Sequence, residues 1–373
     1  MTTTADRLAA GRAIGRVMRH GAWSNVVSRV EANVEGADVA AVQGIVFAAL
    51  RSLPAIDSAL ARAARRSLGE IDPAVVDLLR VAVAELLDRR TPGPLVVDSI
   101  VHAVRGVHRS AAGFANAVLR RISEAPPKVQ TLEDIGIPGF VDEALRHVLE
   151  PKEVDAFWWA CQQSPAVGLR SPSHVEGATR VAGVDDAWLW TAGGPPPVGI
   201  PIQDPASVAV GNAVSAGPGD VVLDVAAAPG GKTAHLVDQV GDAVVAMDRS
   251  RRRVGDAAGR VPAARWMVAD GTRLPFVESV FDRVLVDAPC TGLGTLRRRP
   301  EIRYRVRSEE MLRLATVQRA MLTEALRVVR SGGRVVYSVC TVTPLETIDV
   351  VAGLGGRPPD GLPGIPYGDG WLM

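Results

Sequence analysis

The segment Val221–Leu236, VVLDVAAAPGGKTAHL, constrains the fold of this chain more than any other. It opens with a short apolar run, passes through a loop of alanine, proline and glycine, and then enters a pattern typical of a helix. Buried parallel strands are short apolar runs of this kind. A loop without bulky side chains lets a ligand approach the backbone, and the following helix offers unpaired N–H groups and its positive dipole end. The segment therefore predicts a nucleotide-type cofactor site.

Two common nucleotide-binding motifs do not match this loop. A phosphate-binding loop requires glycine at position 226, where this chain has Ala226, and the dinucleotide pattern G-x-G-x-x-G is absent. The acidic Asp224 would also be unfavourable beside a triphosphate. A carboxylate at this place suits a ligand with an amino group and a positive centre, so we expect S-adenosylmethionine.

The same strand pattern repeats downstream of this segment. Short apolar runs end in aspartates, namely Ala243–Met247 before Asp248, Arg265–Ala269 before Asp270, and Val284–Val286 before Asp287. In open α/β sheets ligands bind at the carboxyl ends of the strands, and a carboxylate after the second strand can accept both ribose hydroxyls. We expect these aspartates to share one sheet edge, although any single one could simply cap a helix.

The first third of the chain is predicted to be helical. Apolar residues recur at helical spacing over positions 5–125, and basic residues outnumber acidic ones there. This surplus is compatible with RNA binding, for instance through Arg120 and Arg121, and almost equally with a solvated helical surface. A length of 373 residues allows two or three domains. We expect a helical domain at 1–126, a small α+β connecting domain at 127–205 and a Rossmann-like α/β domain at 206–373.

Two cysteines are expected at the edge of the sheet where the aspartates lie. Cys290 follows the strand that ends in Asp287, and a fifth apolar run, Arg334–Tyr337, leads to Cys340. A thiolate that adds to carbon 6 of a pyrimidine makes carbon 5 nucleophilic, so that it can accept a methyl group. An acid beside the base could hydrogen-bond the ring nitrogen and amino group of cytosine. Position alone leaves open which cysteine attacks, and two unreactive structural cysteines are the alternative.

A basic run with a tyrosine follows Cys290 almost directly. Such a run beside a reaction site predicts contacts to the phosphate backbone of a nucleic acid, with a solvated face as the alternative. The residues expected to make these contacts are Arg297, Arg298, Arg299 and Arg303.

Taken together, these motifs resemble the bacterial Sun (Fmu) family of ribosomal RNA cytosine-5 methyltransferases. The likeness is carried by Asp224–Thr233, Asp287–Gly294 and Tyr337–Glu346, and Ala111–Ile122 resembles the NusB-like domain that precedes the methyltransferase domain in members specific for 16S RNA. The resemblance implies a multidomain fold with an all-α NusB-like domain. It also implies 5-methylcytosine formation in RNA, most of all in 16S ribosomal RNA.

The resemblance also assigns roles to individual residues. Cys340 would be the nucleophile that forms the covalent adduct with cytosine, Cys290 would assist product release, and Asp287 would face both cofactor and target base. Asp248 would hold the ribose and Asp270 would lie near the adenine. The methionine part of S-adenosylmethionine would be wrapped by Ala226, Ala227, Ala228, Pro229, Gly230, Gly231 and Lys232.

Some features depart from the family pattern and leave other functions open. The cofactor loop begins with Ala226 where cysteine is common, Thr341 replaces a serine after the nucleophile, and the connecting domain and the tail after Glu346 are short. The same chemistry on transfer RNA or another RNA is one alternative. A non-catalytic RNA-binding or ribosome assembly factor that retains the fold is another.

Composition bounds the surroundings in which the chain is expected to act. Cys161, Cys290 and Cys340 form neither a disulfide framework nor a metal-ligand spacing, so we expect no metal and a reducing, cytoplasmic compartment. No apolar run reaches membrane-spanning length. We expect RNA, as ribosomal RNA or a small-subunit assembly particle, to be the partner of a monomer that has no membrane contact.

Overall fold

A computed structural model describes residues 2–88, 91–356 and 371–372 of the chain. These residues form two compact units. The helical unit comprises Met1–Asp142 with Cys161–Gln163 and Leu296–Arg305. The second unit comprises Glu143–Ala160, Ser164–Thr295 and Val306–Met373.

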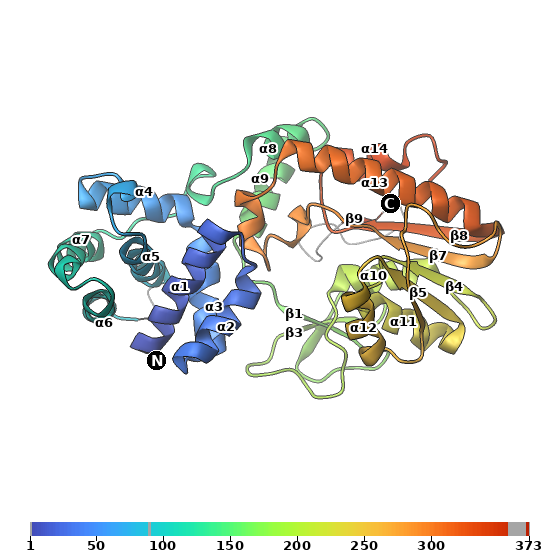
Figure 1. Ribbon diagram of the computed structural model, residues 1–373, viewed down its shortest axis with the longest axis horizontal. Helices are drawn as coiled ribbons and strands as arrows, with labels where there is room; N and C mark the ends of the chain where they lie inside the picture. The colour runs from blue at the N-terminus through green and yellow to red at the C-terminus, as the bar shows by residue number, and fades with distance from the viewer. Residues whose placement is uncertain (1, 89–90, 357–370, 373) are drawn as a thin grey trace. The chain divides into compact units, whose positions relative to one another are not determined.

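The helical unit is a bundle of helices (Figure 1). Their apolar faces meet in one core. Its N-terminal helix is fixed by a capping box, in which Thr3 and Asp6 exchange side-chain and backbone hydrogen bonds. Ile14, Leu79 and Leu119 in the core are fully buried. The helices are α1 (Thr4–His20), α2 (Ser24–Glu35), α3 (Val39–Arg51), α4 (Leu53–Ala64), α5 (Pro73–Asp88), α6 (Gly93–Val107) and α7 (Ala112–Glu124). The predicted all-helical N-terminal domain is confirmed.

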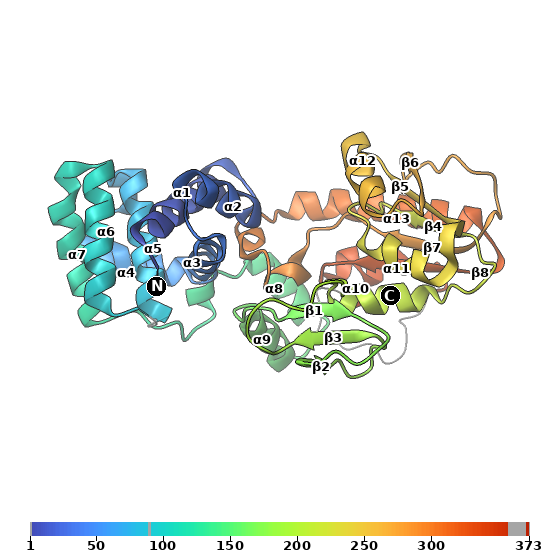
Figure 2. The same ribbon diagram turned by 90° about the horizontal axis from the view of Figure 1, so that it is seen from below.

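After α7 in the sequence, the chain forms helices and a small antiparallel sheet, as predicted for the connecting domain. The helices are α8 (Gly139–Arg146) and α9 (Pro151–Ala160). The strands are β1 (Val167–Arg170), β2 (Ala178–Arg180) and β3 (Ala187–Trp190), in the order β1-β3-β2 (Figure 2). The boundaries of the connecting domain, 127 and 205, stay predictions.

The second unit contains a six-stranded sheet in the order β6-β5-β4-β7-β8-β9. All neighbouring strands run parallel except β9, which is antiparallel to β8. The strands are β4 (Val222–Val225), β5 (Val244–Asp248), β6 (Arg265–Val268), β7 (Phe281–Asp287), β8 (Val329–Val339) and β9 (Trp371–Leu372). Because the strand order reverses beside β4, a ligand crevice is expected at the carboxyl ends of β4 and β7.

Helices cover both faces of this sheet, as Figure 1 shows. Alternate strand residues point to opposite faces, so Leu223 and Val225 pack in one core with α13 and α14, while Val222 packs in another core with α10 and α11. The helices are α10 (Pro205–Val214), α11 (Gly231–Val240), α12 (Arg251–Arg260), α13 (Ser308–Val328) and α14 (Ile348–Val351). The predicted Rossmann-like α/β domain is confirmed. Much of the short tail noted in the sequence, at positions 357–370, lies outside the described residues.

Candidate active site

The small-residue loop lies between β4 and α11, where the sequence predicted it. Ala226 (φ 61°) and Gly230 (φ 100°) adopt left-handed backbone, and the Ala227 N–H donates to the Met247 carbonyl at 2.8 Å. Gly230 precedes α11 without a side-chain cap. The first N–H groups of α11 are therefore available to an anionic group such as the carboxylate of a methionine moiety.

Aspartates mark the carboxyl ends of the strands on either side of this loop. Asp248 ends β5 and is almost fully buried. One of its oxygens accepts the Ser250 N–H at 2.9 Å, and the other lies 3.0 Å from the Arg253 guanidinium. Arg253 also donates to the Ala228 carbonyl, so it ties the cofactor loop to Asp248. The sequence reasoning missed this arginine, which lies five positions after Asp248.

Asp270 and Asp224 differ from the simple picture of aspartates at strand ends. Asp270 is exposed two residues beyond β6, where it accepts the Thr272 N–H and hydroxyl at 2.9 and 2.8 Å. Asp224 lies inside β4, is fully buried and accepts the Thr233 hydroxyl at 2.7 Å, so its carboxylate is not exposed to a ligand as the sequence suggested. Burial raises the pKa of Asp224 to about 7, against the hydrogen bond from Thr233.

An ion pair joins α11 to the end of β7. The Lys232 ammonium donates to Asp287 Oδ2 at 2.9 Å, and the Ser338 hydroxyl of β8 donates to Asp287 Oδ1 at 3.2 Å. Burial would lower the pKa of Lys232, but the negative charges of Asp287, Cys340 and Asp224 hold that pKa above its usual value. Lys232 is therefore a fixed positive charge at the carboxyl ends of β7 and β8.

The two cysteines meet at the same sheet edge. Their Sγ atoms are 3.1 Å apart, and the Cys340 N–H donates to Cys290 Sγ at 3.2 Å. Both side chains are partly exposed. The hydrogen bond with Cys340 and burial raise the pKa of Cys290 well above its usual value, and the negative charges of Cys340 and Glu346 add to this effect.

The arginines proposed from the sequence as RNA contacts do not form one exposed run. Arg299 is exposed, with its guanidinium 5.3 Å from the Trp23 ring centre, while Arg297 and Arg298 are half-buried. Arg303 is only 5% exposed, and it donates to the Ile135 carbonyl at 2.7 Å. The prediction that Arg303 contacts RNA is therefore wrong, because this guanidinium is buried and hydrogen-bonds backbone carbonyls inside the helical unit.

Two further basic residues lie at the end of α7 in the helical unit. Arg120 and Arg121 are both exposed. Arg121 donates to the Ala63 carbonyl at 2.7 Å, while Arg120 projects from the same turn of the helix. Both remain accessible to a nucleic acid.

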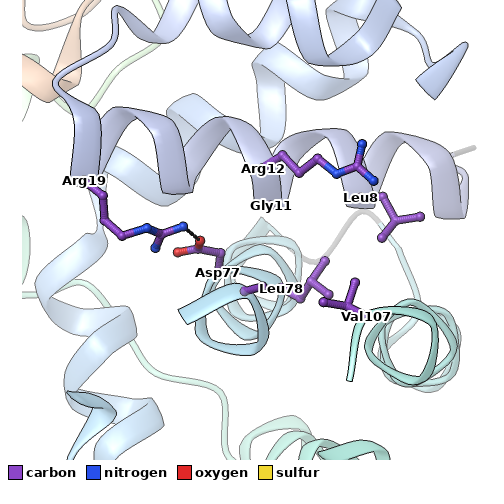
Figure 3. A pocket seen from close by; sticks show the side chains of 8 residues that line it. Leu8, Gly11, Arg12, Arg19, Asp77, Leu78 and Val107 are labelled. Carbon is purple, nitrogen blue, oxygen red and sulfur yellow. Dashed lines mark hydrogen bonds and ion pairs between the residues drawn. The ribbon is translucent and has the colours of Figure 1, made fainter. Parts of the chain in front are cut away.

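A pocket of about 210 Å³ lies in the helical unit and contains none of the predicted catalytic residues (Figure 3). Gly11 and Leu78 contribute to its lining from α1 and α5. At its rim Arg19 pairs with Asp77 at 2.6 Å, which neutralises both charges. Arg12 also lines the pocket, and its guanidinium pairs with Glu35.

Among the described residues, no group of three or more histidine, cysteine or acidic side chains is arranged to hold a metal ion. Within the same residues, no single helix is long and apolar enough to cross a bilayer; α3 and α4 reach that length and composition only together, with a bend of 79° between them.

These features fit S-adenosylmethionine: a loop of small residues, an uncapped helix start and buried or edge carboxylates at the ends of β5 and β7. With the sheet order, they define a Rossmann-like methyltransferase that uses S-adenosylmethionine and carries a helical N-terminal domain. The model of the 16S rRNA methyltransferase RsmB/F family matches residues 213–357, and the NusB family model matches residues 4–124. The chain belongs to the RsmB/F family of rRNA methyltransferases.

Curated relatives and a solved structure extend this match over most of the chain. Ribosomal RNA small subunit methyltransferase B of Thermus thermophilus is 35% identical, over 85% of this chain and 78% of its own length. The protein of the same name from Xylella fastidiosa is 32% identical, over 83% and 80%. The crystal structure of PH0851 shares the fold, with a TM-score of 0.76 and 22% identity over 99% of this chain and 95% of that chain.

Proposed function

We propose that this protein methylates carbon 5 of a cytosine in 16S ribosomal RNA through a covalent adduct with Cys340. The observation that carries the proposal is the Cys290–Cys340 pair, 3.1 Å between sulfurs, beside the Lys232–Asp287 ion pair. A cationic neighbour favours a thiolate at Cys340, while the surroundings of Cys290 favour the neutral thiol. This charge pattern agrees with Cys340 as the nucleophile, which is the role that the family resemblance implies.

The chemistry assigns one step to each side chain. The Cys340 thiolate forms a bond to carbon 6 of the cytosine, and the electron pair of the 5,6 double bond moves to carbon 5. Asp287 accepts a hydrogen bond from the cytosine amino group as charge redistributes. S-adenosylmethionine, when bound, supplies the methyl group to carbon 5. Solvent water then accepts the carbon 5 proton, the electron pair of that C–H bond re-forms the 5,6 double bond, and the bond between carbon 6 and Cys340 Sγ breaks to release a thiolate. Cys290, whose sulfur lies 3.1 Å away, assists this release by hydrogen-bonding the departing sulfur.

The proposed binding residues follow from their positions. Asp248 would hold the ribose, Asp270 would lie near the adenine, and the loop from Ala226 to Lys232 would enclose the methionine portion. The target base must leave its stack to reach the cysteines. Phosphate contacts outside the site are assigned to the accessible arginines of the original set, which are Arg120, Arg121, Arg297, Arg298 and Arg299.

The test compares wild type, Cys290→Ala and Cys340→Ala with labelled S-adenosylmethionine and either small ribosomal subunits or total RNA from cells that lack the protein. We expect 5-methylcytosine only with wild type and a denaturation-resistant protein–RNA adduct only with Cys290→Ala. Sequencing of the trapped RNA identifies the target and separates ribosomal from transfer RNA. Normal turnover by Cys340→Ala would refute the nucleophile assignment. Cofactor binding without methylation of any RNA would favour a non-catalytic assembly factor.

A further inference from the structure

A buried carboxylate holds both cysteine loops, although no step of the proposed reaction uses it. Glu346 is fully buried behind the cysteines. Its Oε1 accepts the Thr291 N–H at 2.9 Å, and its Oε2 accepts the Thr291 hydroxyl at 2.5 Å and the Thr341 hydroxyl at 3.2 Å. Thr291 directly follows Cys290 and Thr341 directly follows Cys340. One side chain therefore contacts the residue after each sulfur.

Further contacts fix the carboxylate itself. Gln318 of α13, also fully buried, donates from the same nitrogen to Glu346 Oε1 at 3.1 Å and to the Pro289 carbonyl at 2.9 Å. The Tyr337 hydroxyl donates to the Glu346 carbonyl at 2.7 Å. A buried carboxylate is costly unless donors surround it, and here the donors come from both cysteine loops and from a helix.

The two threonines are also joined to each other, with their hydroxyl oxygens 2.8 Å apart. Each hydroxyl has one proton, so when Thr291 donates to Glu346, Thr341 shares its single proton between Thr291 Oγ1 and Glu346 Oε2. The Gly294 N–H donates to the Cys340 carbonyl at 3.0 Å, which adds a backbone link between the same loops. A shift of either loop breaks several of these bonds together.

We propose that Glu346 is a positioning residue that sets the separation of Cys290 and Cys340 and keeps their chemical roles distinct. The inference deepens the proposed function and rests on it for the roles of the two thiols. The negative charge of Glu346 adds to the interactions that raise the pKa of Cys290, whereas Lys232 interacts favourably with the charge of Cys340.

The test uses Glu346→Gln in the full chain, with Glu324→Gln as its matched control. Glu324 also accepts a backbone N–H, from Leu274 at 2.9 Å, but it contacts neither cysteine loop. The first measurement needs no RNA: the rates at which Cys290 and Cys340 are alkylated by iodoacetamide, followed by mass spectrometry. We expect wild type and Glu324→Gln to react faster at Cys340. In Glu346→Gln this preference should fall about tenfold, which corresponds to a pKa change of one unit.

The second measurement separates positioning from folding. We expect kcat for methylation to fall about 100-fold in Glu346→Gln, because misplacement by an ångström has effects of that size. The Kd for S-adenosylmethionine should stay within about twofold of wild type, since no contact to the cofactor loop is lost. Glu346→Asp keeps the charge with a shorter reach and should recover part of the alkylation preference.

Wild-type kcat together with the wild-type alkylation ratio in Glu346→Gln would overturn the proposal. An equal loss of cofactor binding and kcat would also overturn it, because that pattern indicates general misfolding. If Glu346→Gln does not fold, Thr291→Val is used instead, because it removes the hydroxyl that donates to Glu346. The ratio of Cys340 to Cys290 alkylation in that variant then tests the proposal. Failure of wild type to form 5-methylcytosine would refute the proposed function, while the alkylation ratio still tests the role of Glu346.

Discussion

At the scale of residues, the site separates two chemically identical side chains by their surroundings. Cys290 and Cys340 lie in contact, yet Lys232 interacts with the charge of Cys340, while the charge of Glu346 adds to the raised pKa of Cys290. A thiolate is the reactive form of cysteine, so in the proposed mechanism the cation favours attack by Cys340. The proposed roles thus depend on neighbours in space rather than on the order of the cysteines in the chain.

Removing the cation should move the pH dependence of the reaction. In Lys232→Gln the thiolate loses a positive neighbour, so its pKa rises. We expect the acidic limb of the kcat/KM profile to move up by about one pH unit, with activity at pH 7 about tenfold lower. Lys232→Arg keeps the charge and serves as the control. Single-turnover methylation between pH 5.5 and 9 measures the effect, and an unmoved limb in Lys232→Gln would contradict it.

Asp248 should contribute to cofactor affinity more than to stability. Asp248→Asn keeps an oxygen for the Ser250 N–H but loses the charge that two ribose hydroxyls would share. A charged hydrogen bond is worth about 1.5–3 kcal/mol, so the Kd for S-adenosylmethionine should rise at least about tenfold. Titration calorimetry measures the change, and an unchanged Kd would remove Asp248 from the binding site.

The sequence predicted the site residues that follow a strand and missed those that act from a distance. An apolar run in the sequence locates a strand and its last residue, and Asp248 and Asp287 are indeed the last residues of β5 and β7. Glu346 and Arg253 could not be found in this way, since their partners come from other loops. Arg303 was assigned to RNA because a basic run looks exposed when neighbouring elements are unknown.

At the scale of elements, periodicity predicts the type of an element better than its buried face. Val26, Val27, Val30 and Val34 recur at helical spacing and α2 does form there, but only Val27 is buried and the others are 42–69% exposed. Strand β8 begins at Val329, five residues before the apolar run that predicted it, because parallel pairing to β7 extends beyond that run. Tertiary pairing is not visible in a local pattern.

The contact between α10 and α11 should make stability depend on pH. His235 of α11 is 3% exposed and packs on Gly211 of α10, where an added Cβ would lie 2.1 Å from the ring. Burial lowers the pKa of His235 to about 4, and the charge of Arg170 adds to this effect. The unfolded chain therefore binds a proton below about pH 6.5 that the folded chain does not, and stability falls as pH decreases from there toward 4.

This effect is measurable as a difference between two proteins. Between pH 7 and pH 5 the free energy of unfolding of wild type should fall by about 2 kcal/mol more than that of His235→Gln. Asp224, whose pKa burial raises to about 7, acts in the opposite direction over the same range, but it does so in both proteins and cancels. Urea unfolding at the two pH values measures this difference. If the free energy of unfolding changes equally with pH in wild type and His235→Gln, His235 does not titrate as expected.

At the scale of the whole molecule, the chain after the catalytic loop belongs to the helical unit. Leu296–Arg305 leaves the methyltransferase unit after Thr295 and rejoins it at Val306. Within the helical unit, Glu301 is fully buried and accepts the Ser24 N–H and hydroxyl at 3.0 and 2.8 Å, and the Tyr304 hydroxyl donates to the Leu50 carbonyl at 2.6 Å. Sequence reasoning assigned this segment wholly to the methyltransferase domain because long-range contacts leave no local pattern.

Loss of this anchor should release the segment without unfolding the cofactor site. In Glu301→Ala two buried donors of Ser24 lose their acceptor, which costs about 2 kcal/mol and raises the open population about 30-fold. The segment contains several arginines, so limited trypsin digestion at low protease should cut it about 30-fold faster than in wild type. Glu310→Ala, which removes an exposed carboxylate paired with Arg313, should leave this cleavage rate unchanged.

The same variant tests whether the helical unit has a role in catalysis. Thr295 joins the anchored segment directly to the loop that carries Cys290, so a released segment removes a restraint from that loop. We expect the kcat of Glu301→Ala to fall while the Kd for S-adenosylmethionine stays at the wild-type value, because Asp248 and the Ala226–Lys232 loop lie in the other unit. Faster cleavage with wild-type kcat would mean that the helical unit holds the segment only for stability. A wild-type cleavage rate would show that Glu301 is not the anchor.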